Sequence, residues 1–406
     1  MKSDERFPMG FWNYADIQRQ GPEDVRDWDE AGMTLTLGPE YGLDQAGTDR
    51  MVAILDECAR RDIRLILCHA HSSYLHLKEV GEETFKKDFA AAVAAIGPHP
   101  ALYGFHVGDE PMAENFEAAC RTMRLQREVA PNLTPFLNLM SCQDGFEGRV
   151  GFTDWADYLD AYTEGGQPDF YCYDCYMQMI EGTSGWETYF TNLRHYHEAE
   201  QRHGIPFWTT LLSCGHFGFH YPKEDDLRWQ LSSAVAHGAK GLLWFFFYMR
   251  HPHCNYQVPP IDEHYERTET YQWLSRICRT FLKTTAPVLR QAKLRRVSHV
   301  GQAWGGTALF DGQGIVQSAR SLYDVPLIVS EFQHPDGSDY VLVVNNATTG
   351  FNQAELSVQA RDLHHVGWDG EENLPMGPGK EKEGDLVTVT PWLAPGQMEL
   401  WRVEPL

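Results

Sequence analysis

Eight short apolar or aromatic runs follow one another through the first 250 residues, and helix-like segments separate most of them. Strands that alternate with helices are typical of a parallel sheet. A count of eight favours closure into a (β/α)8 TIM barrel over an open, doubly wound sheet. The predicted strands are 8–14, 33–38, 63–69, 102–110, 134–141, 169–176, 206–214 and 241–248, and the predicted helices are 47–61, 81–96, 113–130, 186–203, 223–238 and 269–283.

The pattern changes near residue 288, where β-like runs begin to alternate with turns rich in Gly, Pro, Asn and Asp. This alternation is typical of an antiparallel β-sandwich. A chain of 406 residues also exceeds the usual size of one hydrophobic core. We therefore predict a barrel domain over 1–287 and a β-sandwich domain over 288–406, with a mobile surface loop at 373–385 and strands at 327–332, 340–345, 354–358, 386–390 and 398–403.

The fourth predicted strand, 102–110, ends abruptly in two acids and a proline. Side chains alternate along a strand, so the bulky ones should pack on helices and the small, polar ones should line the barrel. This phase places His106 and Glu110 toward the lumen and the mouth, and it turns Asp109 sideways as a supporting group. Alternatively, the acids cap a helix that begins at Pro111.

In a TIM barrel the residues that close the strands converge on one site. Here they are rich in aromatic, amide and carboxylate side chains, which suits a sugar with apolar ring faces and many hydroxyls. We predict that a small carbohydrate is held by Trp12, Asn13, Glu40, Tyr41, His69, His71, His106, Asp109, Asn138, Tyr173, Tyr176, His216 and Trp244.

Cleavage of a glycosidic bond typically requires two carboxyl groups. Glu110 is the first candidate, and Asp174, which ends the sixth predicted strand, is the second. A purely structural role for Asp174, orienting a tyrosine or an arginine, is equally consistent with the sequence. Other candidates for the second carboxyl are Glu40, Asp109, Asp262 and Glu263, of which the last two lie in a loop long enough to cover the mouth.

Two alternatives to a carboxylate glycosidase follow from the same residues. The pair His69 and His71, with His106, Asp109 and Asp174, has the ligand types of a metal-dependent hydrolase. A barrel that binds carbohydrate without cleaving it is the other alternative. A thiol nucleophile at Cys214 beside His216 is disfavoured, because adjacency in sequence does not make a catalytic dyad. The pair Cys172 and Cys175 falls within a strand, whereas redox and metal C-x-x-C sites lie in turns or at helix starts.

The formal charge of −23 excludes nucleic acids and anionic membrane surfaces as partners, because both attract clustered Lys and Arg. No run approaches the roughly 20 apolar residues of a membrane span, and the N-terminus lacks the pattern of an export signal. Nine scattered cysteines indicate free thiols in a reducing compartment. We predict a cytoplasmic protein without a cofactor or metal, and self-association into a homo-oligomer stays open.

Gly108-Asp109-Glu110-Pro111 resembles the fourth-strand Asn-Glu-Pro or Asp-Glu-Pro motif of the large (β/α)8 glycoside hydrolase clan that includes β-galactosidases and cellulases. The segments 227–230, 236–241 and 244–245 are similar to the last helix and eighth strand of the β-galactosidase-like branch. The resemblance implies a retaining glycosidase with Glu110 as acid/base and Asp109 as the supporting residue beside it.

The chain departs from the clan at the seventh strand. The clan's nucleophile is a Glu that ends this strand, and this chain has Ser213, Cys214 and Gly215 there. Either the second carboxyl has moved, with Asp174 on the sixth strand as the favoured position, or the protein uses a different mechanism or binds carbohydrate without cleaving it.

Overall fold

A computed structural model describes residues 6–250, 255–373 and 379–406. The chain forms two compact units. The first comprises Met1–Tyr176, His195–Tyr221 and Gly241–Gln272, and the second comprises Met177–Arg194, Pro222–Lys240 and Trp273–Leu406. The boundary between 287 and 288 stays a prediction.

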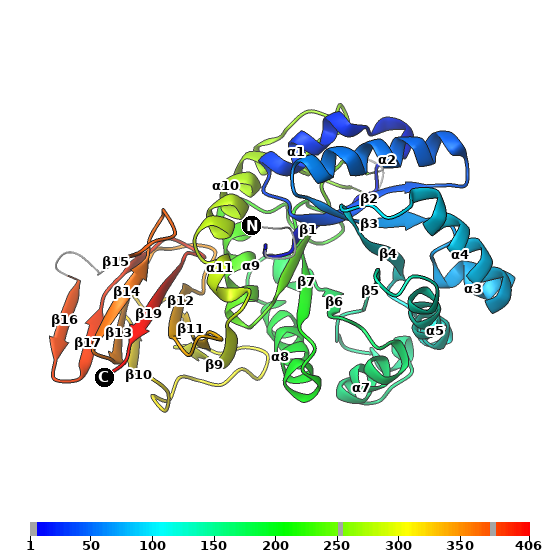
Figure 1. Cartoon of the computed structure of the whole chain (residues 1–406). Coiled ribbons are helices and arrows are strands. Elements are labelled where there is room, and N and C mark those ends of the chain that lie inside the picture. Colours follow the sequence, from blue (N-terminus) through cyan, green and yellow to red (C-terminus); the bar gives the residue numbers. More distant parts are fainter. Residues whose placement is uncertain (1–5, 251–254, 374–378) are drawn as a thin grey trace. The chain divides into compact units, whose positions relative to one another are not determined.

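The first unit contains the eight parallel strands of a TIM barrel, and all eight predicted strands are present (Figure 1). They form two four-stranded sheets, β1-β8-β7-β6 and β2-β3-β4-β5. At one junction, the Thr34 and Thr36 hydroxyls accept hydrogen bonds from main-chain N–H groups of β1. At the other, Leu139 N–H donates to the Cys172 carbonyl over 2.8 Å. The strands are β1 Met9–Phe11, β2 Leu35–Tyr41, β3 Arg64–His69, β4 Leu102–Asp109, β5 Thr134–Asn138, β6 Tyr171–Asp174, β7 Phe207–Leu212 and β8 Gly241–Phe245.

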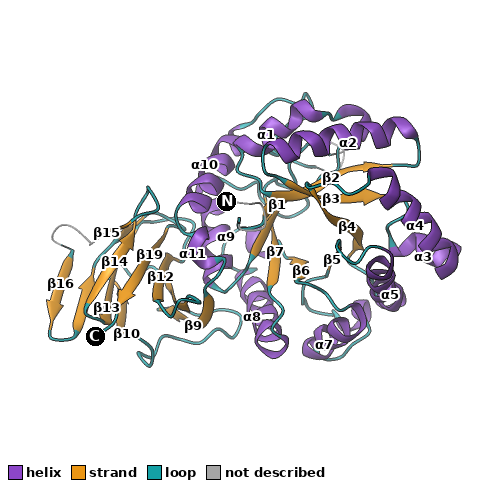
Figure 2. Cartoon of the chain, viewed as in Figure 1, coloured by secondary structure: helices purple, strands orange, loops and turns teal. Residues whose placement is uncertain are grey.

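The helices of the first unit lie outside its strands (Figure 2). Their apolar faces pack on the outward side chains of the barrel. For example, Phe89 of α4 meets Phe105 of β4 edge-on, with the ring centroids 5.1 Å apart, as the alternation in β4 predicts. The helices are α1 Val25–Glu30, α2 Gln45–Arg60, α3 Tyr74–Val80, α4 Glu82–Ile96, α5 Ala113–Val129, α6 Glu147–Val150, α7 Trp155–Gly166, α8 Trp186–His203, α9 Glu224–Ala236, α10 Glu269–Lys283 and α11 Ala286–Leu289, with 3-10 turns at Ile17–Arg19, Pro22–Asp24 and Met177–Met179.

The second unit holds the predicted β-sandwich. Its sheets have the orders β10-β13-β17-β16, with β18 beside β13, and β15-β14-β19-β12-β11-β9. All of these pairings are antiparallel, and apolar side chains such as Leu356 and Val343 form a fully buried core. The strands are β9 Lys293–Val300, β10 Val316–Ser321, β11 Leu327–Gln333, β12 Asp339–Asn345, β13 Asn352–Gln359, β14 Asp362–Val366, β15 Glu372–Asn373, β16 Lys380–Glu383, β17 Leu386–Val389, β18 Trp392–Leu393 and β19 Met398–Glu404.

The prediction of a mobile loop at 373–385 is wrong for the part of this segment that forms β16. Within it, β16 pairs with β17, and Lys380 opposite Val389 begins the ladder. Backbone hydrogen bonding to a neighbouring strand therefore holds this charged sequence, although its composition resembles a loop. Residues 374–378 lie outside the described part of the chain.

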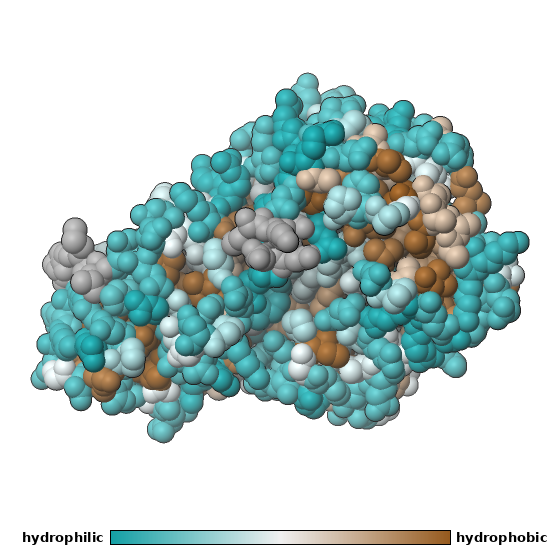
Figure 3. Space-filling model, viewed as in Figure 1, coloured by the Kyte–Doolittle hydropathy of each residue, from teal (hydrophilic) through white to brown (hydrophobic). Residues whose placement is uncertain are grey.

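Hydrophilic residues cover most of the face drawn in Figure 3, in keeping with the high acidic content of the chain. Among the described residues, no helix combines the length and the apolar character needed to cross a bilayer.

Candidate active site

A bulge in β4 determines how its terminal acids are presented. The pairing of β4 with β5 shifts between His106, opposite Phe136, and Gly108, opposite Leu137, so Val107 is an extra residue. Beyond an inserted residue the alternation of side chains changes phase. Asp109 therefore lies opposite Asn138 and lines the cavity, which corrects the prediction that it points sideways.

Glu110 follows the bulge in a left-handed backbone conformation, with φ of +37°. Its main-chain N–H donates to the Asn138 carbonyl over 3.0 Å. A residue with a β-carbon rarely adopts this conformation, and such residues are concentrated at functional sites. The Glu110 side chain is half-buried.

Asn138 links two of the acids. Its Nδ2 donates to an oxygen of Asp109 over 3.0 Å and to an oxygen of Asp174 over 2.9 Å. Asn138 ends β5 and is 1% exposed, so the amide is fixed between the ends of β4 and β6. The structure thus brings Asp109, Asn138 and Asp174 together, as the sequence predicted for residues that close neighbouring strands.

The carboxyl groups of Asp109, Glu110 and Asp174 all have pKa values above their ordinary range. Burial is the largest cause for each of them. The Asp109 charge further raises the pKa of Glu110, and the charges of Glu110 and Asp109 raise that of Asp174. Asp109 is exposed, whereas Glu110 and Asp174 are half-buried. Acids that repel one another and are partly withdrawn from water retain a proton more readily than free carboxyls do.

Hydrogen bonds and cations oppose these shifts unequally. Asn138 and the Tyr176 side chain both lower the pKa of Asp174 by hydrogen bonding to its charged form. Asn138, the Arg250 charge and the main chain of Glu110 lower the pKa of Asp109. The charge of Arg149, an exposed residue of α6, lowers the pKa of Glu110. The anions of Asp174 and Asp109 are thus better stabilised by donors than that of Glu110.

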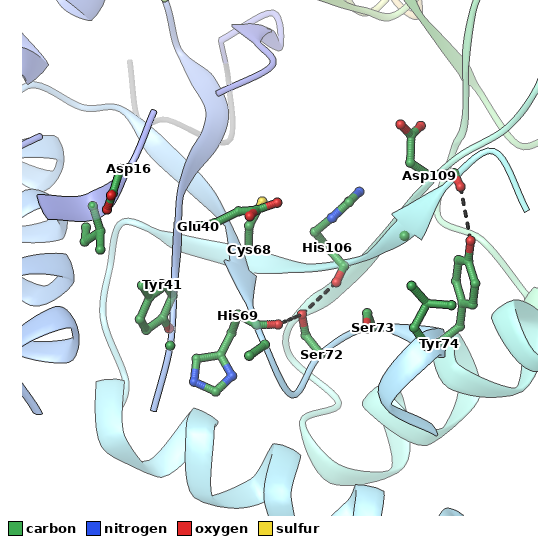
Figure 4. A pocket seen from close by; sticks show the side chains of 15 residues that line it. Asp16, Glu40, Tyr41, Cys68, His69, Ser72, Ser73, Tyr74, His106 and Asp109 are labelled. Atoms are coloured by element: carbon green, nitrogen blue, oxygen red, sulfur yellow. Dashed lines mark hydrogen bonds between the residues drawn. The ribbon is translucent and has the colours of Figure 1, made fainter. Parts of the chain in front are cut away.

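A cavity of about 690 Å³ opens beside Asp109 at the ends of β2, β3 and β4 (Figure 4). Of the residues predicted to bind substrate, Glu40, Tyr41, His69, His106 and Asp109 line it. Its further lining residues are Asp16, Ile17, Gly42, Cys68, Ala70, Ser72, Ser73, Tyr74, Leu75 and Gly108.

The cavity wall is held by hydrogen bonds to the main chain. The Ser72 hydroxyl lies 2.8 Å from the His69 carbonyl and 2.7 Å from that of His106, and the Tyr74 hydroxyl lies 3.3 Å from that of Asp109 (Figure 4). Burial lowers the pKa of His69 and of His106 to about 4, and for His69 the charges of other histidines contribute. Both imidazoles are therefore neutral near pH 7 and can donate to or accept from hydroxyls.

Aromatic rings from the ends of β6 and β8 lie near Asp174. The ring of Tyr176 lies 5.1 Å from that of Phe245 and 5.8 Å from that of His216. The Arg250 guanidinium lies 3.8 Å from the centre of the Tyr14 ring, which is within the range of a cation–π contact. Burial lowers the pKa of His216 to about 4. These rings supply apolar faces next to the carboxyl cluster.

Two predicted aromatic site residues lie in the barrel wall instead. Tyr173 is 0% exposed and stacks on Tyr196 of α8 at 3.9 Å. Trp244 is also 0% exposed and lies opposite Phe11 of β1, which packs on Trp28 of α1. Paired residues on adjacent strands face the same side of a sheet. Trp244 therefore faces the helices, and the next residue, Phe245, faces the mouth.

Two further predicted binding residues have structural roles in the loop after β1. Asn13 is 3% exposed, donates to the Gln20 side chain and accepts from Ala15 N–H, so both ends of its amide are engaged. Trp12 is 4% exposed, donates to the Thr210 hydroxyl over 3.2 Å and meets the His106 ring edge-on at 5.6 Å. Trp12 supports the cavity residue His106 from within the barrel.

The alternative metal set of His69, His71, His106, Asp109 and Asp174 does not gather in the structure. Among the described residues, the group with donor atoms within 4.8 Å of one another consists of His71, His76 and Asp88. His71 does not line the cavity, while the Nδ1 of His69 accepts from the main-chain N–H of His71 over 3.0 Å.

Two other candidates for the second carboxyl, Asp262 and Glu263, lie in the chain after β8. Asp262 stabilises a turn, because its Oδ1 accepts from the N–H groups of His264 and Glu266, both over 2.9 Å; Glu263 is exposed. The described cysteines are free, and burial raises the pKa of the Cys214 thiol to about 12, so it is protonated near neutral pH.

Several residues around the site were not among those predicted to bind substrate. Ser72 and Ser73 follow β3 directly, so their position after a barrel strand was an available signal. Tyr14, Tyr74 and Arg250 end or follow predicted strands and were identifiable as residues of the mouth, but the contact between Tyr14 and Arg250 was not.

Comparisons with solved structures place this geometry in a known fold. A family 5 glycoside hydrolase from Bacteroides vulgatus is 12% identical with a TM-score of 0.58, over 98% of this chain and 89% of that chain. The fold is that of the TIM-barrel glycoside hydrolases. A family 39 glycoside hydrolase from Bacteroides cellulosilyticus is 13% identical with a TM-score of 0.55, over 100% of this chain and 82% of that chain.

The GH51 arabinofuranosidase from Xanthomonas axonopodis pv. citri is 9% identical with a TM-score of 0.52, over 99% of this chain and 97% of that chain. These alignments span both the barrel and the β-sandwich of this chain. No protein-family model matches the chain, and no curated protein matches it either.

Proposed function

We propose that this protein is a glycoside hydrolase that cleaves a small oligosaccharide or glycoside. The observation that carries the proposal is the cluster of Asp109, Glu110 and Asp174, whose pKa values are all raised, at the carboxyl ends of β4 and β6 on either side of Asn138 in β5. Paired carboxyls with shifted pKa values are what glycosidic cleavage requires. The volume of about 690 Å³ falls in the range of cavities that hold small ligands.

In this mechanism Glu110 protonates the glycosidic oxygen as its bond to the anomeric carbon breaks. Asp174 then either attacks that carbon or takes a proton from the water that does so. The resemblance to the glycoside hydrolase clan gives Glu110 the role of acid. Asn138 and Tyr176 stabilise an anionic Asp174 by hydrogen bonding, whereas burial and the charges of Glu110 and Asp109 raise the pKa of Asp174 well above its ordinary range. Once Glu110 holds the proton, one of the two charges that raise the pKa of Asp174 is removed.

The cavity residues would bind the sugar. Neutral His69 and His106 exchange hydrogen bonds with hydroxyls, and Glu40 accepts from them. Outside the cavity lining, the Tyr176 and Phe245 rings beside Asp174 offer apolar faces. This mechanism assigns no role to the β-sandwich. The cytoplasmic location stays a prediction.

The test is hydrolysis of a panel of α- and β-aryl glycosides and short oligosaccharides by the wild type and by Glu110→Gln, each with and without EDTA. The proposal predicts turnover that resists EDTA and that, on the substrates with poor leaving groups, is lost in the variant. Turnover that EDTA abolishes would instead support a metal-dependent hydrolase. Saturable sugar binding without turnover, unchanged in Glu110→Gln, would support a non-catalytic carbohydrate-binding barrel.

A further inference from the structure

Three side chains with metal-ligating atoms meet outside the carboxyl cluster. His71 lies in the loop after β3, His76 in α3 and Asp88 in α4, and their donor atoms all lie within 4.8 Å of one another. All three residues are partly buried, which leaves a path for a small ion. The imidazole rings of His71 and His76 are stacked, with centroids 4.4 Å apart and planes at 15°. The His76 Nε2 lies 3.0 Å from an Asp88 carboxylate oxygen.

We propose that His71, His76 and Asp88 form a binding site for a divalent transition-metal ion, with Zn²⁺ as the preferred ion. Two imidazoles and a carboxylate are among the ligand sets of Zn²⁺, and they are softer than the oxygen sets that Mg²⁺ and Ca²⁺ favour. Zn–ligand bonds of about 2.0–2.1 Å at tetrahedral angles place ligand atoms roughly 3.3 Å apart. The donor atoms now lie within 4.8 Å of one another and the imidazole rings are nearly parallel, so binding requires both rings to rotate toward the ion. Water fills the fourth position.

An ordinary His–Asp pair does not account for this arrangement. His99 and Asp56 form such a pair elsewhere in the barrel, with 3.2 Å between Nε2 and Oδ1. His76 and Asp88 have in addition a second imidazole stacked against the first, and the donor atoms of all three converge. The His99 pair thus provides a matched control with the same chemistry and one imidazole fewer.

The site would fasten the wall of the cavity. The segment between the two histidines carries Ser72, Ser73 and Tyr74, which line the cavity, whereas none of the three metal ligands does so. An ion that joins the β3 loop to α3 and α4 therefore stabilises this segment without touching the carboxyl cluster. This inference is independent of the proposed glycosidase activity, because a barrel without turnover would still bind the ion.

The experiment is calorimetric titration of tag-free, EDTA-treated and dialysed protein with ZnCl₂, together with the thermal midpoint with and without the ion. We expect one Zn²⁺ per chain and a higher midpoint, because a ligand that binds the folded state stabilises it. His76→Gln and Asp88→Asn should each weaken the affinity at least tenfold, and His99→Gln should leave it unchanged.

Two results would overturn the proposal: an absence of stoichiometric binding up to 1 mM ZnCl₂, or binding by both His76→Gln and Asp88→Asn with wild-type affinity. The second would place the ion on other histidines of the chain. Midpoints of all variants without zinc establish that each one folds.

Discussion

The substitution Asn138→Leu tests whether the hydrogen bonds from Asn138 stabilise the charged forms of Asp109 and Asp174. Leucine has a similar volume but no donor, so the variant removes the hydrogen bonds of 3.0 Å and 2.9 Å to Asp109 and Asp174. A hydrogen bond to a charged group contributes about 1.5–3 kcal/mol. If the bond to Asp174 acts in the transition state, its loss lowers kcat/KM by about 10- to 150-fold, since about 1.4 kcal/mol corresponds to a factor of ten.

The pH dependence gives a second, independent readout. Asn138 lowers the pKa of Asp174 and of Asp109 by bonding to their charged forms. Without it both pKa values rise further, so more of Asp174 is protonated at a given pH. The acidic limb of the kcat/KM profile, which reports ionisation of the base or nucleophile, must therefore move to higher pH.

The assay is kcat/KM from pH 4 to pH 9 on the best substrate of the glycoside panel. Asn352→Leu is the matched control, because Asn352 is a fully buried asparagine of the β-sandwich whose Nδ2 donates to the Val325 carbonyl over 2.8 Å. It should cost stability without moving the pH profile. A folded Asn138→Leu protein with wild-type kcat/KM and an unshifted acidic limb would refute the reasoning.

Three further predictions concern the end of β4. Asp109→Asn removes the charge that raises the pKa of Glu110, so the alkaline limb of the kcat/KM profile should move to lower pH; a shift to higher pH would contradict the assigned cause. Folding raises the pKa of Glu110, so its ionisation weakens the wild type as pH rises; Glu110→Gln should have the higher thermal midpoint at pH 8, and an equal difference at pH 4 would oppose this linkage. In Gly108→Ala the new β-carbon would lie 2.1 Å from the Tyr74 ring, which should cost about 1–3 kcal/mol in denaturant unfolding, whereas Gly148→Ala, with nothing within 4 Å, should cost far less.

The barrel could be predicted from sequence because its signal repeats. Each strand is a short apolar run between helix-like segments, and the β4 run from Leu102 ends at its acids within one residue of the predicted end. Helix α7 was missed, although Trp155, Tyr158, Leu159 and Tyr162 lie on one buried face at helical spacing. Aromatic residues favour strands as well as packed helices, so this stretch carries a mixed local signal.

The proximity of the strand-end residues could be predicted from the sequence, but not their orientation. Asp109, Asn138 and Asp174 come together because they end neighbouring strands, whereas their roles stay a prediction. The direction of Asp109 depends on the bulge at Val107, which arises from pairing with β5 and has no local signature. An error of one residue in phase also explains why Trp244 was predicted to face the mouth, where the structure places Phe245.

The surroundings of the carboxyl cluster required tertiary information. The contact between Tyr14 and Arg250 joins residues 236 positions apart, and the pKa of Glu110 depends on Arg149 in a helix of four residues. Neither relation leaves a periodic pattern in the sequence.

We propose that Glu110 and Asp174 carry out glycosidic cleavage, and kcat/KM of Glu110→Gln and Asp174→Asn tests this, with circular dichroism to verify the fold. We expect each variant to lose at least about 10³-fold on a substrate with a poor leaving group, and Glu110→Gln to lose much less on an activated aryl glycoside, which needs little protonation. A folded variant of either kind that stays within tenfold of the wild type on the poor leaving group would show that its carboxyl does not take part in cleavage.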